Sequence, residues 1–136
     1  AAYAASEKFL TVRNLPNVDR VEGGKRVPLR EAVVSEAASE PWLSQLEQPG
    51  SGLTWFVNVG RLSPEKNQAR LLRAFAEVYK TNQKARLLVI GDGPLRGDLN
   101  RLIQELGLEG VAFMTGPQTN PFAIMAACDC FVLSSR

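Results

Sequence analysis

Apolar and polar positions alternate in blocks along residues 53–136, and each block has the period of one kind of element. The apolar run Leu53–Val59 follows the turn-forming residues 49–52 and predicts a strand. Across Asn67–Lys80, apolar residues recur at spacings of three and four, which is the period of an amphipathic helix. The unbroken apolar run Leu87–Ile90 is typical of a strand that is covered on both faces of a parallel sheet.

The same alternation continues to the end of the chain. A second helical period covers about Pro94–Leu106, and Val111–Met114 reads as a short strand. Asn120-Pro121 opens a third, short helix, with the asparagine as its cap, and Cys130–Leu133 is a fourth strand. Strands and helices that alternate over short connections predict an α/β fold, here a Rossmann-like parallel sheet of at least four strands with flanking helices in three layers.

The first 52 residues are less regular. Their predicted elements are an edge strand (Phe9–Val12), a loop (Val18–Pro28) and two weak helices (Leu29–Ala38 and Pro41–Leu46). We therefore interpret residues 1–52 as an interdomain or edge segment and residues 53–136 as the folded domain. The sequence stops directly after the fourth predicted strand, so we expect it to be a piece of a longer protein that is truncated at the carboxyl end of this domain.

The charges are distributed unevenly although their sum is only +2. Residues 61–101 carry nine Lys or Arg against four Asp or Glu, whereas residues 102–136 carry one against three. A short basic stretch suits an anionic small molecule better than a nucleic acid, and the few aromatic residues are not interleaved with it. The sequence contains no histidine, which removes the commonest general base and metal ligand.

Cys128 and Cys130 are the only cysteines, and they are too few and too close for a structural zinc site or a mutual disulfide. We interpret them as buried, reduced thiols, which fits a cytoplasmic location. No segment has the roughly 18 apolar residues of a membrane span, and the N-terminal residues lack the pattern of a signal peptide.

The strongest candidate site is the junction between the first predicted strand and the first predicted helix. Gly60 ends the strand, and Arg61 and Lys66 lie five residues apart before the helix. In open α/β sheets, ligands bind outside the carboxyl ends of the strands. Arg can hold two phosphate oxygens and Lys adds a point charge, so the pair predicts a clamp for phosphate or pyrophosphate. Solvated surface charges near a helix start would show the same pattern.

A second glycine-containing turn, Gly91-Asp92-Gly93-Pro94, follows the second predicted strand. Glycine at such a turn lets a ligand approach the backbone closely, which makes Gly91 and Gly93 candidate binding residues. The motif lacks the third glycine of a dinucleotide fingerprint, and an ordinary tight turn could use the same residues.

Taken in order, these motifs resemble the C-terminal, donor-binding domain of retaining glycosyltransferases of the GT-B architecture, of the family 4 type. The resemblance covers about residues 53–136. The motifs that carry it are Gly60-Arg61, Glu65-Lys66-Asn67, Leu71-Leu72-x-Ala74-Phe75, Leu87 to Pro94, Val111-x-Phe113-x-x-Gly116 and Asp129 to Ser135.

The resemblance implies roles for individual residues. Arg61 and Lys66 match the cations that hold the donor diphosphate, so they are the candidate catalytic residues, and Gly60 would admit the phosphates. The segment from Phe113 to Gln118 matches the loop that cradles the nucleotide base, with Gln118 as a side-chain contributor. The donor would be a nucleoside diphosphate sugar, and no metal or other cofactor is expected.

Two parts of the family pattern are not in this sequence. The glutamate-containing motif that follows the last strand is missing, and so is the N-terminal acceptor domain. Asp129 does not replace the acidic motif, because we interpret it as a structural residue where the last strand begins. We therefore expect the full-length protein to be a retaining hexosyltransferase of polysaccharide biosynthesis, and we expect this stretch alone to be inactive.

Two alternatives remain open at this point. The domain could be a non-catalytic module that binds a nucleotide or a sugar phosphate, or an α/β domain whose basic residues are incidental. The donor base, the sugar and the acceptor do not follow from these residues.

Overall fold

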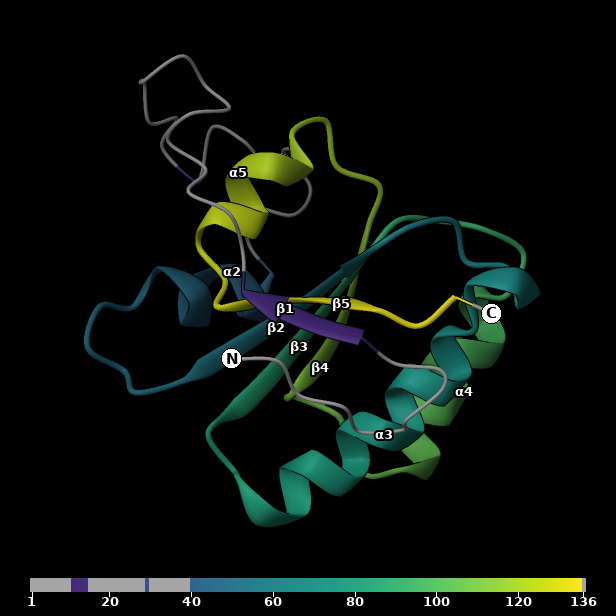
Figure 1. Ribbon diagram of the computed structural model, residues 1–136, viewed down its shortest axis with the longest axis horizontal. Helices are drawn as coiled ribbons and strands as arrows, with labels where there is room; N and C mark the ends of the chain where they lie inside the picture. The colour runs from purple at the N-terminus through teal and green to yellow at the C-terminus, as the bar shows by residue number, and fades with distance from the viewer. Residues whose placement is uncertain (1–10, 15–28, 30–39, 136) are drawn as a thin grey trace.

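The computed structural model describes residues 11–14, 29 and 40–135. Its strands are β1 (Thr11–Asn14), β2 (Thr54–Val59), β3 (Ala85–Ile90), β4 (Ala112–Gly116) and β5 (Cys130–Leu133) (Figure 1). Its helices are α2 (Pro41–Glu47), the short 3₁₀ turn η3 (Pro64–Lys66), α3 (Gln68–Thr81), α4 (Arg96–Glu105) and α5 (Pro121–Ala126).

The strands form one sheet in the order β1-β5-β2-β3-β4. Strands β5, β2, β3 and β4 run parallel, and Val57 of β2 lies opposite Leu88 of β3. Strand β1 pairs antiparallel with β5 at the edge. The structure thus confirms the predicted Rossmann-like parallel sheet with at least four strands, and it adds an antiparallel edge strand that overlaps the predicted Phe9–Val12.

The strand order reverses between β2 and β5. From β2 the chain moves to β3 and then to β4, and it then returns to place β5 on the other side of β2. Connections that leave a parallel sheet in opposite directions diverge, and this opens a crevice at the carboxyl ends of the two strands. The predicted clamp follows β2 and therefore lies at this point.

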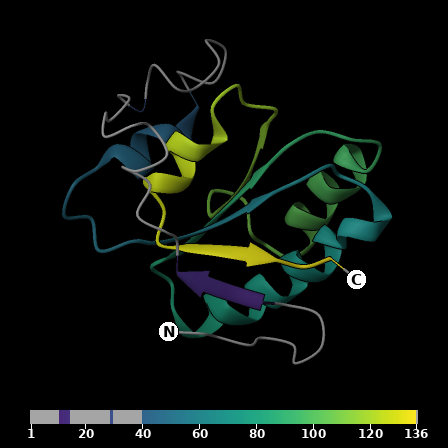
Figure 2. The same cartoon turned by 45° about the horizontal axis from the view of Figure 1, so that its top comes forward.

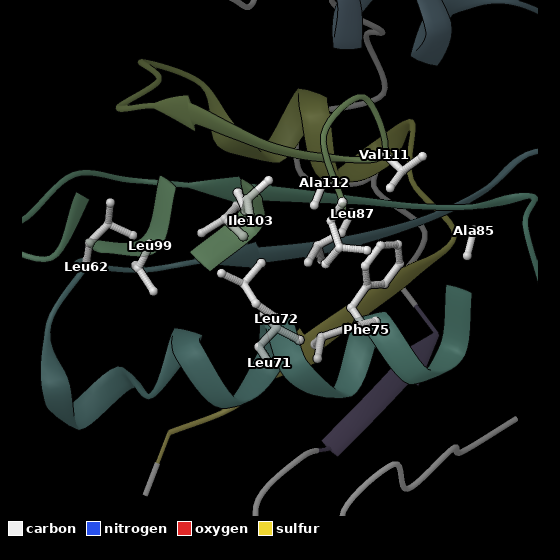
Figure 3. Close-up of a cluster of buried hydrophobic side chains, with 14 residues drawn as sticks. Leu62, Leu71, Leu72, Phe75, Ala85, Leu87, Leu99, Ile103, Val111 and Ala112 are labelled. Carbon is white, nitrogen blue, oxygen red and sulfur yellow. The ribbon is translucent and has the colours of Figure 1, made fainter. Parts of the chain in front are cut away.

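Helices cover the sheet on both faces. Helices α3 and α4 lie on one face, and α2 and α5 lie on the other (Figures 1 and 2). The first face is packed by a continuous apolar cluster to which α3 contributes Leu71, Leu72 and Phe75 and α4 contributes Leu99 and Ile103 (Figure 3). These are the helical positions whose spacing predicted amphipathic helices.

The second face is packed mainly by α2. Its residues Trp42 and Leu43 are buried against Trp55, Val57 and Leu88 of the sheet. The predicted helix Pro41–Leu46 is therefore confirmed, and it packs in the same core as residues beyond 53. The domain division at residue 53 stays a prediction. The predicted loop Val18–Pro28 and all of the predicted helix Leu29–Ala38 except its first residue lie outside the described residues.

Three helix ends show how local sequence and tertiary contacts compete. Helix α5 begins as predicted, because the Asn120 side chain accepts a hydrogen bond from the Ala123 amide at 3.3 Å. Helix α4 begins at Arg96 instead of Pro94, because Leu95 has a φ of −90° and a ψ of 6°, which are not helical, and its amide donates to the Leu62 carbonyl at 3.1 Å. Asn67 is not helical, since its φ of 56° is left-handed, and it separates η3 from α3.

Asp129 and Cys128 have structural environments, as predicted. The Asp129 carboxylate accepts from the Trp55 amide at 2.7 Å, and the Asp129 amide donates to the Trp55 carbonyl at 2.8 Å, which extends the pairing of β2 with β5. Burial raises the pKa of the Cys128 thiol, which donates to the Ile124 carbonyl. Cys130 is partly buried, and both thiols are free.

Across residues 40–135 and the short described pieces before them, no helix is long and apolar enough to cross a membrane.

Candidate anion-binding site at the carboxyl ends of β2 and β5

The loop that follows β2 is held at both of its ends. The Gly60 amide donates to the Ile90 carbonyl at 3.0 Å, which extends the pairing of β2 with β3 by one residue. Leu62 is fully buried and lies at the same end of the apolar cluster as Leu99 of α4 (Figure 3). Arg61 stands between these two anchors, so its backbone is fixed although its side chain is exposed.

Lys66 folds back toward the start of the same loop. A Cβ atom placed on Gly60 would lie 3.7 Å from Lys66 Cδ and 3.8 Å from Lys66 Cε. The aliphatic part of Lys66 therefore passes over Gly60, and its ammonium group lies at the carboxyl edge of the sheet. Among the described residues, no carboxylate forms an ion pair with Arg61 or Lys66.

Strand β5 reaches the same loop from its other side. The Ser134 hydroxyl, one residue beyond β5, donates to the Lys66 carbonyl at 2.7 Å. The end of β5 accordingly lies beside the start of α3 (Figures 1 and 2). The structure thus brings Gly60, Arg61 and Lys66 together at the reversal of strand order. Their ligand stays a prediction.

One carboxylate lies close to these cations. Glu65 accepts a hydrogen bond from the Ser63 hydroxyl at 2.8 Å. A hydrogen bond from its own backbone amide and the one from Ser63 lower the pKa of Glu65, with smaller contributions from the charges of Lys66 and Arg61. Glu65 is therefore ionised near neutral pH and offsets part of the positive potential of the loop.

Gly91 and Gly93 have a different environment from the one that their sequence suggests. A Cβ atom on Gly91 would collide with the Gly60 carbonyl oxygen, and the φ of Gly91 is +140°. A Cβ atom on Gly93 would collide with the Leu62 carbonyl and lie 2.7 Å from the Leu62 amide nitrogen. Both glycines are thus required by the close approach of the neighbouring loop, which is a packing reason that the sequence interpretation did not include. Ligand contact by them stays a prediction.

Gln118 lies in the loop that follows β4, two strands away from β2. It is half-buried, and its amide nitrogen donates to the Thr115 carbonyl at 3.1 Å. The Gly116 carbonyl at the start of this loop accepts from the Gly91 amide at 3.2 Å, so the β3 and β4 loops are joined. A role of Gln118 in holding a nucleotide base stays a prediction.

Sequence reasoning missed a third cation at this edge. Arg96, the first residue of α4, lies over Gly116, where an added Cβ would be 3.8 Å from one guanidinium nitrogen. Its guanidinium also forms an exposed ion pair with Asp92 at 3.5 Å. The sequence signal that could have identified Arg96 was its position three residues after Gly93, because a helix that starts there places the residue at the carboxyl edge of the sheet.

An open depression lined by Ser44, Gln45, Glu47 and Gln48 lies on α2. Gln45 there accepts from Arg86, near the start of β3, so this depression lies toward the amino ends of the strands. Within the ranges that the structure describes, no group of three or more His, Cys, Asp or Glu residues could hold a metal ion.

Comparison with known families agrees with the fold. Residues 47–136 match the family model described as glycosyl transferases group 1. The chain belongs to this family. Its fold is that of the C-terminal domain of GT-B glycosyltransferases, which confirms the GT-B glycosyltransferase domain inferred from the motifs. The family 4 type and the retention of configuration stay predictions.

Several curated glycosyltransferases are similar in sequence to this chain. An uncharacterised glycosyltransferase of Methanocaldococcus jannaschii is 34% identical over 75% of this chain and 25% of its own length. The Campylobacter jejuni enzyme named N-acetylgalactosamine-N,N'-diacetylbacillosaminyl-diphospho-undecaprenol 4-alpha-N-acetylgalactosaminyltransferase is 41% identical over 60% of this chain and 21% of its own length. The chain thus spans about a quarter of the length of the curated relatives it matches.

Solved structures share the fold. HepE of Anabaena, crystallised in complex with UDP and glucose, superposes with a TM-score of 0.53 at 23% identity, over 69% of this chain and 25% of that one. WaaG, described as a glycosyltransferase of lipopolysaccharide biosynthesis, has a TM-score of 0.51 at 18% identity, over 76% of this chain and 28% of that one. At these identities the likeness is evidence for the fold alone.

Proposed function

We propose that this domain binds the diphosphate of a nucleoside diphosphate sugar, and that the whole protein transfers the sugar to an acceptor with retention of configuration, as a family 4 type enzyme. The observation that carries the proposal is the pair Arg61 and Lys66. Both cations are exposed, lack an ion-pair partner among the described residues and stand on a loop that is fixed at the reversal of strand order.

The chemistry gives this pair a catalytic use. As the bond between sugar and phosphate breaks, the departing nucleoside diphosphate gains negative charge. Cations that are already in place stabilise that charge more in the transition state than in the ground state, which lowers the barrier. Side-chain cations can do this without a metal ion, so we propose that none is required.

Family membership supports an enzyme over a non-catalytic module. The Campylobacter relative is named for transfer of N-acetylgalactosamine to a diphospho-undecaprenol-linked sugar, and a relative from Rhizobium meliloti, 42% identical over 58% of this chain and 22% of its own length, is named for lipopolysaccharide core biosynthesis. We therefore propose a role in the assembly of a polysaccharide or a lipid-linked glycan. The free thiols Cys128 and Cys130 favour a cytoplasmic location for this domain.

The test is a titration with UDP and GDP, followed by NMR or calorimetry at fixed ionic strength with a chelator present. The acidic motif and the acceptor domain that the family resemblance implies are not among these 136 residues, so we expect a dissociation constant of about 1 mM. Arg61→Ala removes a charged hydrogen-bond donor, which is typically worth about 1.5–3 kcal/mol, and should weaken binding about tenfold or more.

Arg101→Ala is the matched control. Arg101 is an exposed arginine on α4 that pairs with Asp98 at 3.5 Å, and the same truncation there should change little. If Arg61→Ala binds both nucleotides as well as Arg101→Ala does, the clamp assignment is wrong.

A further inference from the structure

Two buried polar side chains bond to the backbone of the two predicted clamp residues. The Gln68 amide nitrogen donates to the Arg61 carbonyl at 2.8 Å, and the Ser134 hydroxyl donates to the Lys66 carbonyl at 2.7 Å. Gln68 and Ser134 are each only 1% exposed. Neither bond belongs to a helix or a strand ladder, so each is an added constraint on the loop.

These constraints come from two different elements. Gln68 is the first residue of α3, and Ser134 directly follows β5, 68 residues beyond the lysine whose carbonyl it holds. Buried side chains have few available rotamers, so each bond fixes a peptide group of the loop relative to the sheet. Between them, the bonds fix the backbone at both cations.

We propose that Gln68 and Ser134 are positioning residues, which set the separation of the Arg61 and Lys66 charges so that the two cations meet adjacent phosphates of one diphosphate. The inference rests on the proposed function, because it assumes that this pair of cations binds the ligand. It goes further by assigning a role to two buried residues that do not carry charge.

The structure offers a substitution that separates positioning from stability. The second polar atom of Gln68, Oε1, is buried without a hydrogen-bond partner in the described part of the chain. Gln68→Met keeps the length of the side chain but removes both the donor and this unpartnered oxygen. The Ser63 hydroxyl, whose proton bonds to Glu65, lies 3.4 Å from the Arg61 carbonyl and is within reach as an alternative donor. We therefore expect an unfolding midpoint within a few degrees of the parent, because losing the bond is offset by losing the unpartnered acceptor.

The experiment compares UDP with UMP, since only UDP carries two phosphates for two cations. In the full 136-residue chain, Gln68→Met and Ser134→Ala should each weaken UDP binding about three- to tenfold and UMP binding much less, so the ratio of the two affinities falls. Thr81→Ala is the control, because Thr81 also donates a hydroxyl to a carbonyl, that of Val78, at the far end of α3.

Three outcomes would overturn the inference, and they separate it from the proposed function. If Arg61→Ala does not weaken UDP binding, the proposed function fails and the inference fails with it. If Arg61→Ala does weaken UDP binding while Gln68→Met has the same ratio of UDP to UMP affinity as the parent, only the inference fails. Equal loss of UDP and UMP affinity that follows a lowered unfolding midpoint would indicate a purely structural role. If Ser134→Ala does not fold, Gln68→Met alone decides.

Discussion

The loops that follow β2 and β3 leave the sheet side by side, and each starts with a glycine, but their structural roles differ. The β2 loop presents Arg61 and Lys66 to solvent from a backbone held by Gln68 and Ser134. The β3 loop presses Gly91 and Gly93 against the backbone of the first loop. One loop therefore carries the charges, and the other supports it.

The comparison teaches that a glycine-containing turn at a strand end does not by itself indicate a ligand. Packing against a neighbouring loop can also require glycine in such a turn, because a contacting backbone leaves no more room for a Cβ atom than a bound phosphate does. Substitutions at Gly60, Gly91 and Gly93 test this distinction, and those at Gly91 and Gly93 have the largest effects that we expect.

Gly91→Ala and Gly93→Ala should each destabilise the fold by about 3 kcal/mol, because the new methyl group meets backbone that cannot move aside. Gly60→Ala should be tolerated, since its methyl group would make an ordinary contact of 3.7 Å with the flexible Lys66 side chain. Urea unfolding of the three variants measures this order. A Gly93→Ala variant as stable as Gly60→Ala would contradict the support role of the β3 loop.

Asp129 provides a smaller test at the other end of the same strand pair. Its carboxylate and its amide both bond to Trp55, so it joins β5 to β2 far from the clamp. Asp129→Ala should lower the free energy of unfolding by about 1.5 kcal/mol, and Asp129→Asn, which keeps an acceptor, should lose less. Affinity for UDP should not change in the folded protein. A loss of UDP affinity as large as that of Arg61→Ala would show that the two ends of the strand pair are not independent.

Local sequence was sufficient to predict most of the helices and strands. Strand β5 has the predicted bounds Cys130–Leu133, and the Asn120 cap was visible because both signals lie within a few adjacent residues. The start of α4 was wrong by two residues, because Leu95 has a backbone conformation that is not helical and contacts a loop more than 30 residues earlier in the chain. Such a contact leaves no trace in local periodicity.

The candidate site was only partly predictable for the same reason. Arg61 and Lys66 are neighbours in sequence, and their cationic chemistry at a strand end was enough to select them. The strand order that puts β5 beside β2 is a property of the whole sheet. In the sequence, Gln68 is an ordinary polar residue at a helix start and Ser134 an ordinary residue after a strand. Their bonds to the loop that carries Arg61 and Lys66 could therefore be found only in the structure.

The smallest effect that we expect concerns Glu65, the carboxylate on the loop that carries Arg61 and Lys66. Its pKa is lowered from the ordinary value of 4.5 by its own backbone amide and by Ser63. A carboxylate with a lowered pKa stabilises the fold above its ordinary pKa, and this contribution disappears as the pH falls through the lowered value.

The stability of the parent should therefore decrease slightly more on acidification below pH 4.5 than that of Glu65→Gln. Urea midpoints measured from neutral to acid pH compare the two proteins, and identical pH profiles would show that the hydrogen bonds of Glu65 do not persist in solution. At neutral pH the same variant should bind UDP slightly more tightly, by less than about twofold, because an exposed negative charge near the two cations is removed. Weaker binding would instead indicate that Glu65 orders the loop, which would make it part of the framework and not a charge that opposes the ligand.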